Sequence, residues 1–245
     1  MKKSYIIIGV VVVVMLAAIG IYAVINSNSQ SKKQLEENST NIEGTTNTEN
    51  STKENNTENK NKNIQNNQIS NESEENNMYS TGKHHAEIVV KNYGTIALEL
   101  DADVAPITVE NFANLVNEGF YNGLTFHRII SGFMIQGGDP LGNGTGGSSK
   151  TIKGEFASNG VKNSISHVRG TISMARSSMP NSASSQFFIV HQDSTFLDGK
   201  YAAFGTVTSG MEVVDKICAD TAVEDNNGTV AKNNQPVIEK ITIID

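Results

Sequence analysis

The sequence contains one cysteine, Cys218, so no intrachain disulfide bond can form. Basic residues are also few: 19 lysines and arginines stand against 26 aspartates and glutamates, and the formal net charge is −7 at pH 7. The chain lacks the clustered lysines and arginines that nucleic-acid binding requires, so we expect no nucleic-acid partner. Cys218 falls in an expected helix at a spacing that faces inward with Met211 and Val214, which favours a structural thiol over a nucleophile.

Residues 26–77 have no aromatic residue and no proline, and their only apolar side chains are Leu35, Ile42, Ile64 and Ile69. The same segment contains 16 asparagines. It cannot bury enough apolar surface to offset the entropy of ordering its backbone. We therefore expect a disordered Asn/Glu-rich tether across residues 26–83, followed by one compact domain across residues 84–245.

The N-terminus lacks charge for a long stretch. Lys2 and Lys3 precede residues 4–25, which are uncharged and rich in isoleucine and valine, and about 20 such residues can cross a bilayer as a helix. No convincing small-x-small cleavage site follows, and no nearby cysteine could accept a lipid. We expect residues 1–25 to be an uncleaved single-pass membrane anchor, with the domain on the extracytoplasmic side. The alternative is a cleaved signal, which would release a secreted protein.

Several catalytic patterns are missing. The nucleophile elbow G-x-S-x-G does not occur, so hydrolysis has no support from the sequence. The five histidines show no spacing typical of metal ligands. Residues 142–147 match the dinucleotide fingerprint G-x-G-x-x-G, but no helical pattern follows them, and a glycine-rich turn explains them better.

The domain shows many short alternating segments and only two helical ones. Pro106 opens the first expected helix and Gly119 ends it, while residues 211–219 form the second. This pattern favours an all-β fold with two helices, in which a closed antiparallel barrel removes exposed strand edges. The expected strands are residues 86–91, 95–100, 125–130, 133–136, 171–175, 186–190, 201–207 and 237–244.

One run of the sequence carries an unusual combination of side chains. Arg128 lies among apolar residues in the segment 126–130, and strand alternation places it on one face with Ile130. The segment 133–136 sets two large apolar side chains beside the amide of Gln136. By spacing alone, an amphipathic hairpin with a snorkelling arginine is an equally good interpretation.

The run at residues 126–139 resembles the central signature of the cyclophilins, and three further stretches agree in family order: residues 172–176, 185–189 and 196–205. The resemblance extends from about His85 to Asp245. It implies a closed eight-stranded antiparallel β-barrel capped by two α-helices, with the active site on the outer face of the barrel. It also implies a monomeric peptidyl-prolyl cis/trans isomerase that acts on proline-containing polypeptides and needs neither metal nor cofactor.

The resemblance assigns a role to eleven residues. Arg128 matches the catalytic arginine, and Gln136 matches the glutamine that orients it. The substrate-binding positions are Phe133, Met134, Ala175, Arg176, Gln186, Phe188, Phe196, Leu197 and Tyr201. Three of these depart from the commonest eukaryotic pattern: Phe196 stands where tryptophan is frequent, Tyr201 where histidine is frequent and Arg176 where asparagine is frequent. The departures resemble bacterial members and imply weak binding of the inhibitor cyclosporin.

Two other functions compete with the enzyme. The domain could hold proline-containing segments without catalysis, or serve as a structural part of a surface complex. Degenerate members of the family usually lose the arginine or the pocket aromatics. Arg128, Gln136, Phe133 and Phe188 are all present in this chain, which favours the enzyme.

Overall fold

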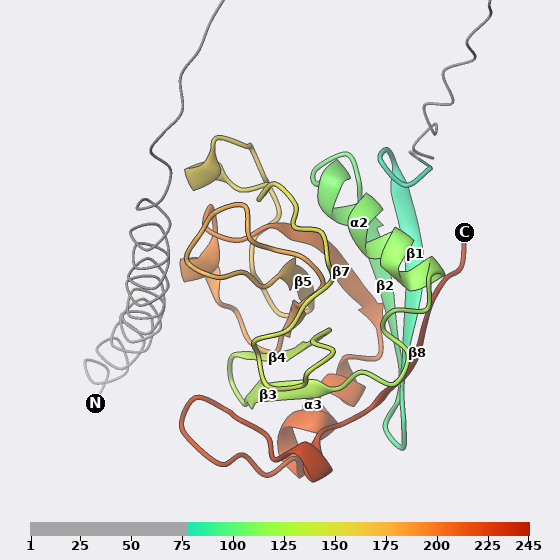
Figure 1. Ribbon diagram of the computed structural model, residues 1–245, viewed down its shortest axis with the longest axis vertical. Coiled ribbons are helices and arrows are strands. Elements are labelled where there is room, and N and C mark those ends of the chain that lie inside the picture. Colours follow the sequence, from blue (N-terminus) through green and yellow to red (C-terminus); the bar gives the residue numbers. More distant parts are fainter. Residues whose placement is uncertain (1–77) are drawn as a thin grey trace, which may run out of the picture. The chain divides into compact units, whose positions relative to one another are not determined.

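A computed structural model of the chain describes residues 78–245, which form eight strands and two α-helices (Figure 1). The expected anchor at residues 1–25 lies outside the described residues, as does nearly all of the expected tether. Among residues 78–245, no helix has the length and apolar character needed to cross a membrane. The elements are β1 (Lys83–Val90), β2 (Gly94–Asp101), α2 (Pro106–Asn117), β3 (Phe126–Ile130), β4 (Met134–Gly137), β5 (Thr171–Met174), β6 (Phe187–Val190), β7 (Ala203–Ser209), α3 (Met211–Asp220) and β8 (Ile238–Ile243).

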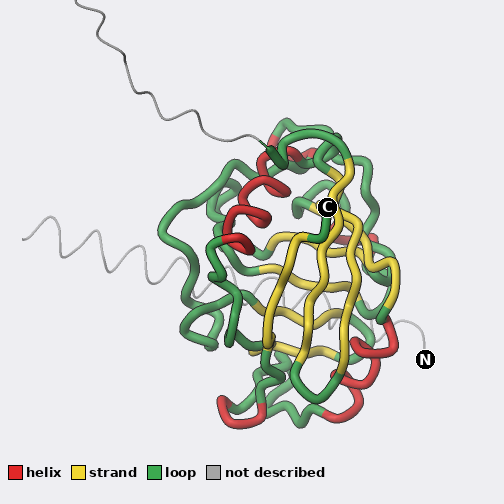
Figure 2. The backbone as a smooth tube through the Cα atoms, turned by 90° about the vertical axis from the view of Figure 1, so that its right-hand side faces the viewer, coloured by secondary structure: helices red, strands yellow, loops and turns green. Residues whose placement is uncertain are grey.

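All strand pairs in the sheet are antiparallel, in the order β3-β4-β6-β5-β7-β2-β1-β8. The hairpin between β1 and β2 turns at Asn92, whose φ of 66° lies in the left-handed region that asparagine tolerates. Both strands alternate as the sequence predicts, with Ile88 and Val90 facing the core from β1 and Ile96 and Leu98 from β2. In Figure 2, one group of strands runs lengthwise in front of a second group that runs across it.

The predicted closed barrel is wrong in one respect, because the sheet is open. β3 and β8 are its two edges, and no ladder joins them. The residues that flank these strands meet instead at a Thr125–Val237 bridge and through a hydrogen bond from the Phe126 N–H to the Pro236 carbonyl (2.9 Å). Pro236 has no N–H to donate, so a regular ladder cannot continue past it.

The core below the sheet is built on aromatic side chains. Phe112 on α2 lies 5.2 Å from Tyr121, 5.7 Å from Phe187 and 5.3 Å from Phe204, measured between ring centroids. All four are fully buried. Centroid distances of this kind suit tilted and edge-to-face packing of aromatic rings. The cluster therefore fixes α2 against strands β6 and β7.

The start of α2 is stabilised by a residue distant in sequence. Ala105 provides no side-chain cap, and Pro106 needs none for its own nitrogen. The buried Glu155 carboxylate instead accepts the N–H groups of Ile107 (3.2 Å) and Thr108 (2.8 Å) and the Thr108 hydroxyl (2.7 Å). A carboxylate at this end also interacts favourably with the helix dipole. At the other end, Gly119 (φ 71°) follows the helix, as predicted.

The two helices lie at opposite ends of the sheet, as Figures 1 and 2 both show. α2 contacts β8 and β2, while α3 contacts β2. Cys218 on α3 is partly buried against the core, and burial raises the pKa of its thiol to about 11. The thiolate therefore does not form at neutral pH, in keeping with a structural thiol. Packing also extends to Tyr79, ahead of the expected domain start at residue 84, since its hydroxyl accepts a hydrogen bond from the Asn117 amide (3.0 Å).

Strands β5 and β6 are buried along their whole length, because apolar groups cover both of their faces. Phe187 and Ile189 point into the main core, while Phe188 and Val190 belong to a second apolar cluster. This second cluster lies on the outer face of the sheet. It is where the predicted site residues gather.

Candidate active site

Strand register brings four polar and aromatic side chains into one row on the outer face. Arg128 of β3 is paired with Gln136 of β4, Gln136 with Phe188 of β6, and Phe188 with Ser173 of β5. Directly paired residues of antiparallel strands place their side chains on the same face of the sheet. The alternation that places Arg128 and Ile130 on one face of β3 is confirmed, because Ile129 between them is buried in the core.

The Arg128 guanidinium is held by a loop almost 100 residues away. Its Nε–H donates to the Asn227 carbonyl (2.8 Å), and its Nη2 donates to Oδ1 of the same residue (3.0 Å). A third and longer bond runs from Nη1 to Gln136 Oε1 (3.3 Å). Burial lowers the pKa of Arg128, an effect that Tyr201 and Asp225 partly oppose, yet arginine remains charged in proteins. A guanidinium has five N–H groups, so these three bonds leave two for a ligand.

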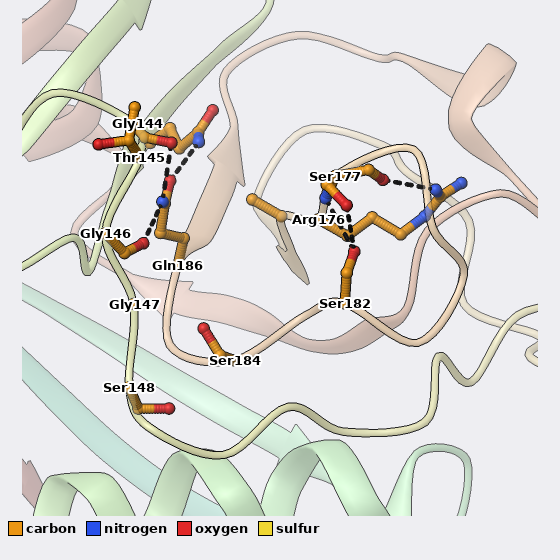
Figure 3. Close-up of a pocket in the computed structure, with 12 residues that line it drawn as sticks. Gly144, Thr145, Gly146, Gly147, Ser148, Arg176, Ser177, Ser182, Ser184 and Gln186 are labelled. Atoms are coloured by element: carbon orange, nitrogen blue, oxygen red, sulfur yellow. Dashed lines mark hydrogen bonds between the residues drawn. The ribbon is translucent and has the colours of Figure 1, made fainter. Parts of the chain in front are cut away.

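Two glutamine amides connect Arg128 to the glycine-rich segment. The Gln186 Nε2 group donates to the carbonyls of Gly144 (3.1 Å) and Gly146 (2.7 Å), as Figure 3 shows. Gln186 Oε1 then accepts a bond from Gln136 Nε2 (2.9 Å). Because a carbonyl can only accept, the direction of every bond in the chain is fixed. Gln136 therefore has to present its oxygen to Arg128.

An apolar pocket lies next to this row. Its buried members come from β4, β6 and a short turn, and they form a cluster separate from the main core. The pocket provides aromatic and aliphatic surface beside a fixed cation, an arrangement suited to a ligand with an apolar ring and a polar backbone. The buried residues are Met134, Phe188, Val190 and Leu197, and the partly buried ones are Ile130, Phe133, Ala175 and Tyr201.

A buried polar group supports Phe188. The His167 ring stacks on Phe188 with centroids 6.0 Å apart and an interplanar angle of 18°. His167 Nδ1 lies 2.8 Å from Asp198 Oδ1, and its Nε2 lies 3.0 Å from Ser173 Oγ. Burial, which Asp198 opposes, lowers the pKa of His167. Ser, His and Asp thus meet in triad order, but Ser173 is fully buried and cannot reach a substrate, so these groups act by fixing Phe188.

The rim of the pocket contains Phe196, Tyr201 and Arg176. The Phe196 ring is 57% exposed and lies 5.6 Å from that of Phe133. The Arg176 guanidinium lies 4.8 Å from the ring centroids of both Tyr201 and Phe156, and its Nε and Nη2 donate to the Lys200 carbonyl. The Arg176 guanidinium therefore interacts with aromatic rings and a backbone carbonyl at the edge of the site.

A cleft of about 370 Å³ opens beside the pocket (Figure 3). The glycine-rich segment forms one wall of it, and this segment is a loop rather than a dinucleotide motif, as predicted. A Cβ atom at Gly146 would come within 2.1 Å of Asp139 Oδ1, and backbone N–H groups of Leu141, Asn143 and Gly144 hold that carboxylate in place, so this close approach favours glycine. The cleft is lined by Gln136, Gly144, Thr145, Gly146, Gly147, Ser148, Ala175, Arg176, Ser177, Ser182, Ser184 and Gln186.

The structure brings all eleven predicted site residues into one continuous region of the surface. Sequence reasoning missed Asn227, which lies in an exposed-loop segment with no motif of its own. It also treated residues 142–147 only as a turn, although their glycines signal a close backbone approach. Across residues 78–245, no group of three or more His, Cys, Asp or Glu side chains is placed to hold a metal ion.

The open antiparallel sheet with two end helices is the fold of the cyclophilin class, and the fixed arginine lies beside its outer apolar pocket. The chain belongs to the family of cyclophilin type peptidyl-prolyl cis-trans isomerases, whose family model matches residues 85–244. The predicted family and enzyme activity are confirmed.

Curated relatives and solved structures agree with this assignment. The chain is 49% identical over 135 residues to a peptidyl-prolyl cis-trans isomerase of Helicobacter pylori, covering 54% of this chain and 80% of the relative. It is 50% identical over 117 residues to peptidyl-prolyl cis-trans isomerase B of Bacillus subtilis, covering 48% and 78%. The crystal structure of a Cryptosporidium parvum cyclophilin type isomerase in the presence of the dipeptide Ala-Pro matches with a TM-score of 0.58 and 32% identity, covering 66% of this chain and 99% of that one.

The two hydrogen bonds that Asn227 accepts from Arg128 lead to a prediction. Asn227→Ala removes the Oδ1 acceptor and leaves the backbone carbonyl, so we expect kcat/KM to fall about tenfold, as suits one hydrogen bond to a charged group. The neighbouring Asn226 is exposed, and Asn226→Ala is the matched control. The measurement is isomerase turnover on a proline peptide. Equal activity of the two variants would show that Asn227 does not hold the arginine in its working position.

Proposed function

We propose that this isomerase is held at the outer side of the cytoplasmic membrane, where it accelerates X–Pro rotation in polypeptides that fold there. One observation carries the proposed chemistry: the Arg128 guanidinium is fixed beside the apolar pocket of Phe133, Met134 and Phe188. Two of its N–H groups have no partner among the described residues and can bind a ligand. The expected anchor at residues 4–25 supports the location. A bond that otherwise isomerises in tens to hundreds of seconds limits folding in any compartment.

The reaction requires no bond to break. The amide barrier of about 18–20 kcal/mol arises because the nitrogen lone pair is delocalised into the carbonyl group. The pocket receives the proline ring and holds it while the preceding carbonyl rotates. A group that interacts with the lone pair lowers the barrier only when the amide is twisted, so it stabilises the transition state more than either ground state.

Arg128 is the group placed to do this. An N–H of its guanidinium donates to the prolyl nitrogen as the amide twists and the lone pair becomes localised. The bonds to Asn227 and Gln136 fix the guanidinium in advance, so little reorganisation accompanies the reaction. The surrounding apolar surface excludes water, which strengthens the interaction. No proton is transferred in this mechanism.

A bound polypeptide runs across the rim of the pocket. The Cryptosporidium relative was crystallised in the presence of Ala-Pro, the shortest segment that contains an X–Pro bond. In this chain, segments flanking the proline lie along Gln136 and Gln186 and enter the cleft with its four serines. The cleft offers hydroxyl and backbone groups, so we expect tolerance of many client sequences. We also expect a monomer and weak binding of cyclosporin, for which Phe196 lacks a donor.

The test of catalysis is exchange NMR on a proline peptide with the full chain in detergent. An isomerase broadens and exchanges the cis and trans resonances at enzyme concentrations far below that of the peptide. A binding module of the kind considered from the sequence would shift the resonances without accelerating exchange. That result, with Arg128 and Asn227 in place, would overturn the proposed mechanism.

The location makes its own prediction. Full-length protein should sediment with membranes, resist extraction by salt and carbonate, and be digested by protease added to intact cells. The basis is the uncharged stretch at residues 4–25. A chain that lacks residues 1–25 is the control and should not sediment. Release of a mature protein that begins near Asn26 would show a cleaved signal, and protection from protease would place the domain inside.

A further inference from the structure

His191 is tied to the turn that carries Phe133. It follows β6, and its backbone N–H donates to the Phe133 carbonyl (2.8 Å). Its ring reaches the same turn, because the Gly132 N–H lies 2.8 Å from His191 Nδ1. One residue therefore holds both sides of the Gly132–Phe133 peptide unit. Phe133 forms part of the proline pocket and lies against Phe196 at its rim.

These contacts determine the protonation of the ring. A backbone N–H can only donate, so His191 Nδ1 has to be the unprotonated, accepting nitrogen. The other nitrogen, Nε2, lies 3.1 Å from Asp215 Oδ1 on α3, and a carboxylate only accepts. The imidazole is thus neutral, with its proton on Nε2. A second proton, on Nδ1, would face the Gly132 N–H and remove that hydrogen bond.

The remaining charges around the ring come from three segments. Arg169 binds the Asp215 carboxylate through both Nη1 and Nη2 (2.8 Å each), and Nη1 also donates to the His191 carbonyl. The hydrogen bond from Arg169 holds the pKa of Asp215 below its usual range, so the carboxylate stays ionised. Asp193 accepts the Arg169 N–H (2.9 Å), and the Cys218 thiol lies within electrostatic range of Asp215 and Arg169. The turn itself presents only the Gly132 backbone to the ring.

The turn has little else to fix it. Gly132 is exposed and has a φ of 82°, and the turn closes through one bond from the Phe133 N–H to the Ile130 carbonyl (2.9 Å). Among the described residues, the His191 ring is the side chain from outside the turn that forms a hydrogen bond with it. The His191 side chain is 12% exposed, whereas the Gly132 end of the contact lies at the surface.

We propose that His191 is a positioning residue for this isomerase: its neutral imidazole holds the Gly132–Phe133 turn, and so the Phe133 wall of the proline pocket, in place. The proposal rests on the proposed function, because it assumes that Phe133 contacts the substrate proline. Activity then depends on the Gly132 contact rather than on the Asp215 contact.

Two amide substitutions separate the contacts. In His191→Asn, Oδ1 occupies the place of Nδ1 and accepts the Gly132 N–H. In His191→Gln, the longer amide reaches toward Asp215 and leaves Gly132 without its partner. We expect kcat/KM of His191→Gln to fall about fivefold below that of the unmodified chain, as suits one lost hydrogen bond. His191→Asn should keep kcat/KM close to that of the unmodified chain.

The assay is exchange NMR of a proline peptide with the full chain in detergent. Thermal unfolding of each variant accompanies it, and equal midpoints exclude a loss of fold. Recovery of activity in His191→Asn, but not in His191→Gln, separates the Gly132 contact from the Asp215 contact. Equal kcat/KM of His191→Gln and the unmodified chain, or the same loss in His191→Asn, overturns the role of His191. Absence of turnover in all three proteins overturns the proposed function instead.

Discussion

Arg128→Ala is expected to lower kcat/KM for a proline peptide by about 10²–10³, because one preorganised donor to a developing charge contributes that much in enzymes. The apolar pocket remains in this variant, so binding of the peptide should weaken far less than turnover. The fold should persist, since Arg128 lies on the outer face of β3 and the core residues on that strand are Phe126 and Ile129. The measurements are exchange NMR for turnover and peptide titration for affinity.

Arg128→Lys is the matched control for charge. A lysine ammonium cannot reproduce the planar fork that donates from Nε and Nη2 to the two Asn227 oxygens, so we expect poor rescue. Activity of the lysine variant near that of the unmodified chain would show that a positive charge is sufficient. Near-normal turnover in Arg128→Ala would remove the arginine from the mechanism altogether.

Phe196→Trp should tighten cyclosporin binding at least about tenfold. The indole N–H can donate a hydrogen bond to the inhibitor, whereas phenylalanine supplies a ring and no donor. A buried acceptor that gains a partner is stabilised by about 1–3 kcal/mol. The site of the change suits this role, because the Phe196 ring is 57% exposed at the pocket rim and lies against Phe133. The measurement is the inhibitor Kd of both proteins by titration.

Peptide turnover is the internal control for this change. A small substrate need not use the new donor, so its kcat/KM should stay within about twofold. Phe196→Leu is a second control that adds no donor and should not tighten cyclosporin. Tight inhibition of the unmodified protein, with no gain in the tryptophan variant, would show that residue 196 does not contact the inhibitor.

The strands and helices could be predicted from local patterns. Residues close together in the sequence determine these features, so they can be read from it. They include the alternation in β1 and β2, the turn at Asn92, and the limits of α2 at Pro106 and Gly119. The proximity of Arg128 and Gln136 could also be predicted from the sequence, because the two residues lie on adjacent strands of one hairpin.

Features that depend on distant contacts could not be predicted. The cap of α2 comes from Glu155, some 47 residues beyond the helix start, and the loop that fixes Arg128 lies 99 residues away. The opening of the sheet depends on whether its two edge strands, which are distant in sequence and share no motif, pair along their length. Arg176 lines the cleft beside the pocket, but its place between two aromatic rings could not be predicted, since one of them belongs to Phe156 from a different segment.

The pairing of β1 with β8 has a consequence for how the protein is made. Ala86 lies opposite Ile243, so the first strand of the domain cannot complete its ladders until β8, more than 150 residues further along, has been synthesised. Contacts between such distant residues slow folding, since a long loop must close before they form. An N-terminal fragment would expose β1 as an open edge prone to aggregation. The domain therefore has to fold as one unit that includes β8, rather than stepwise from its N-terminal end.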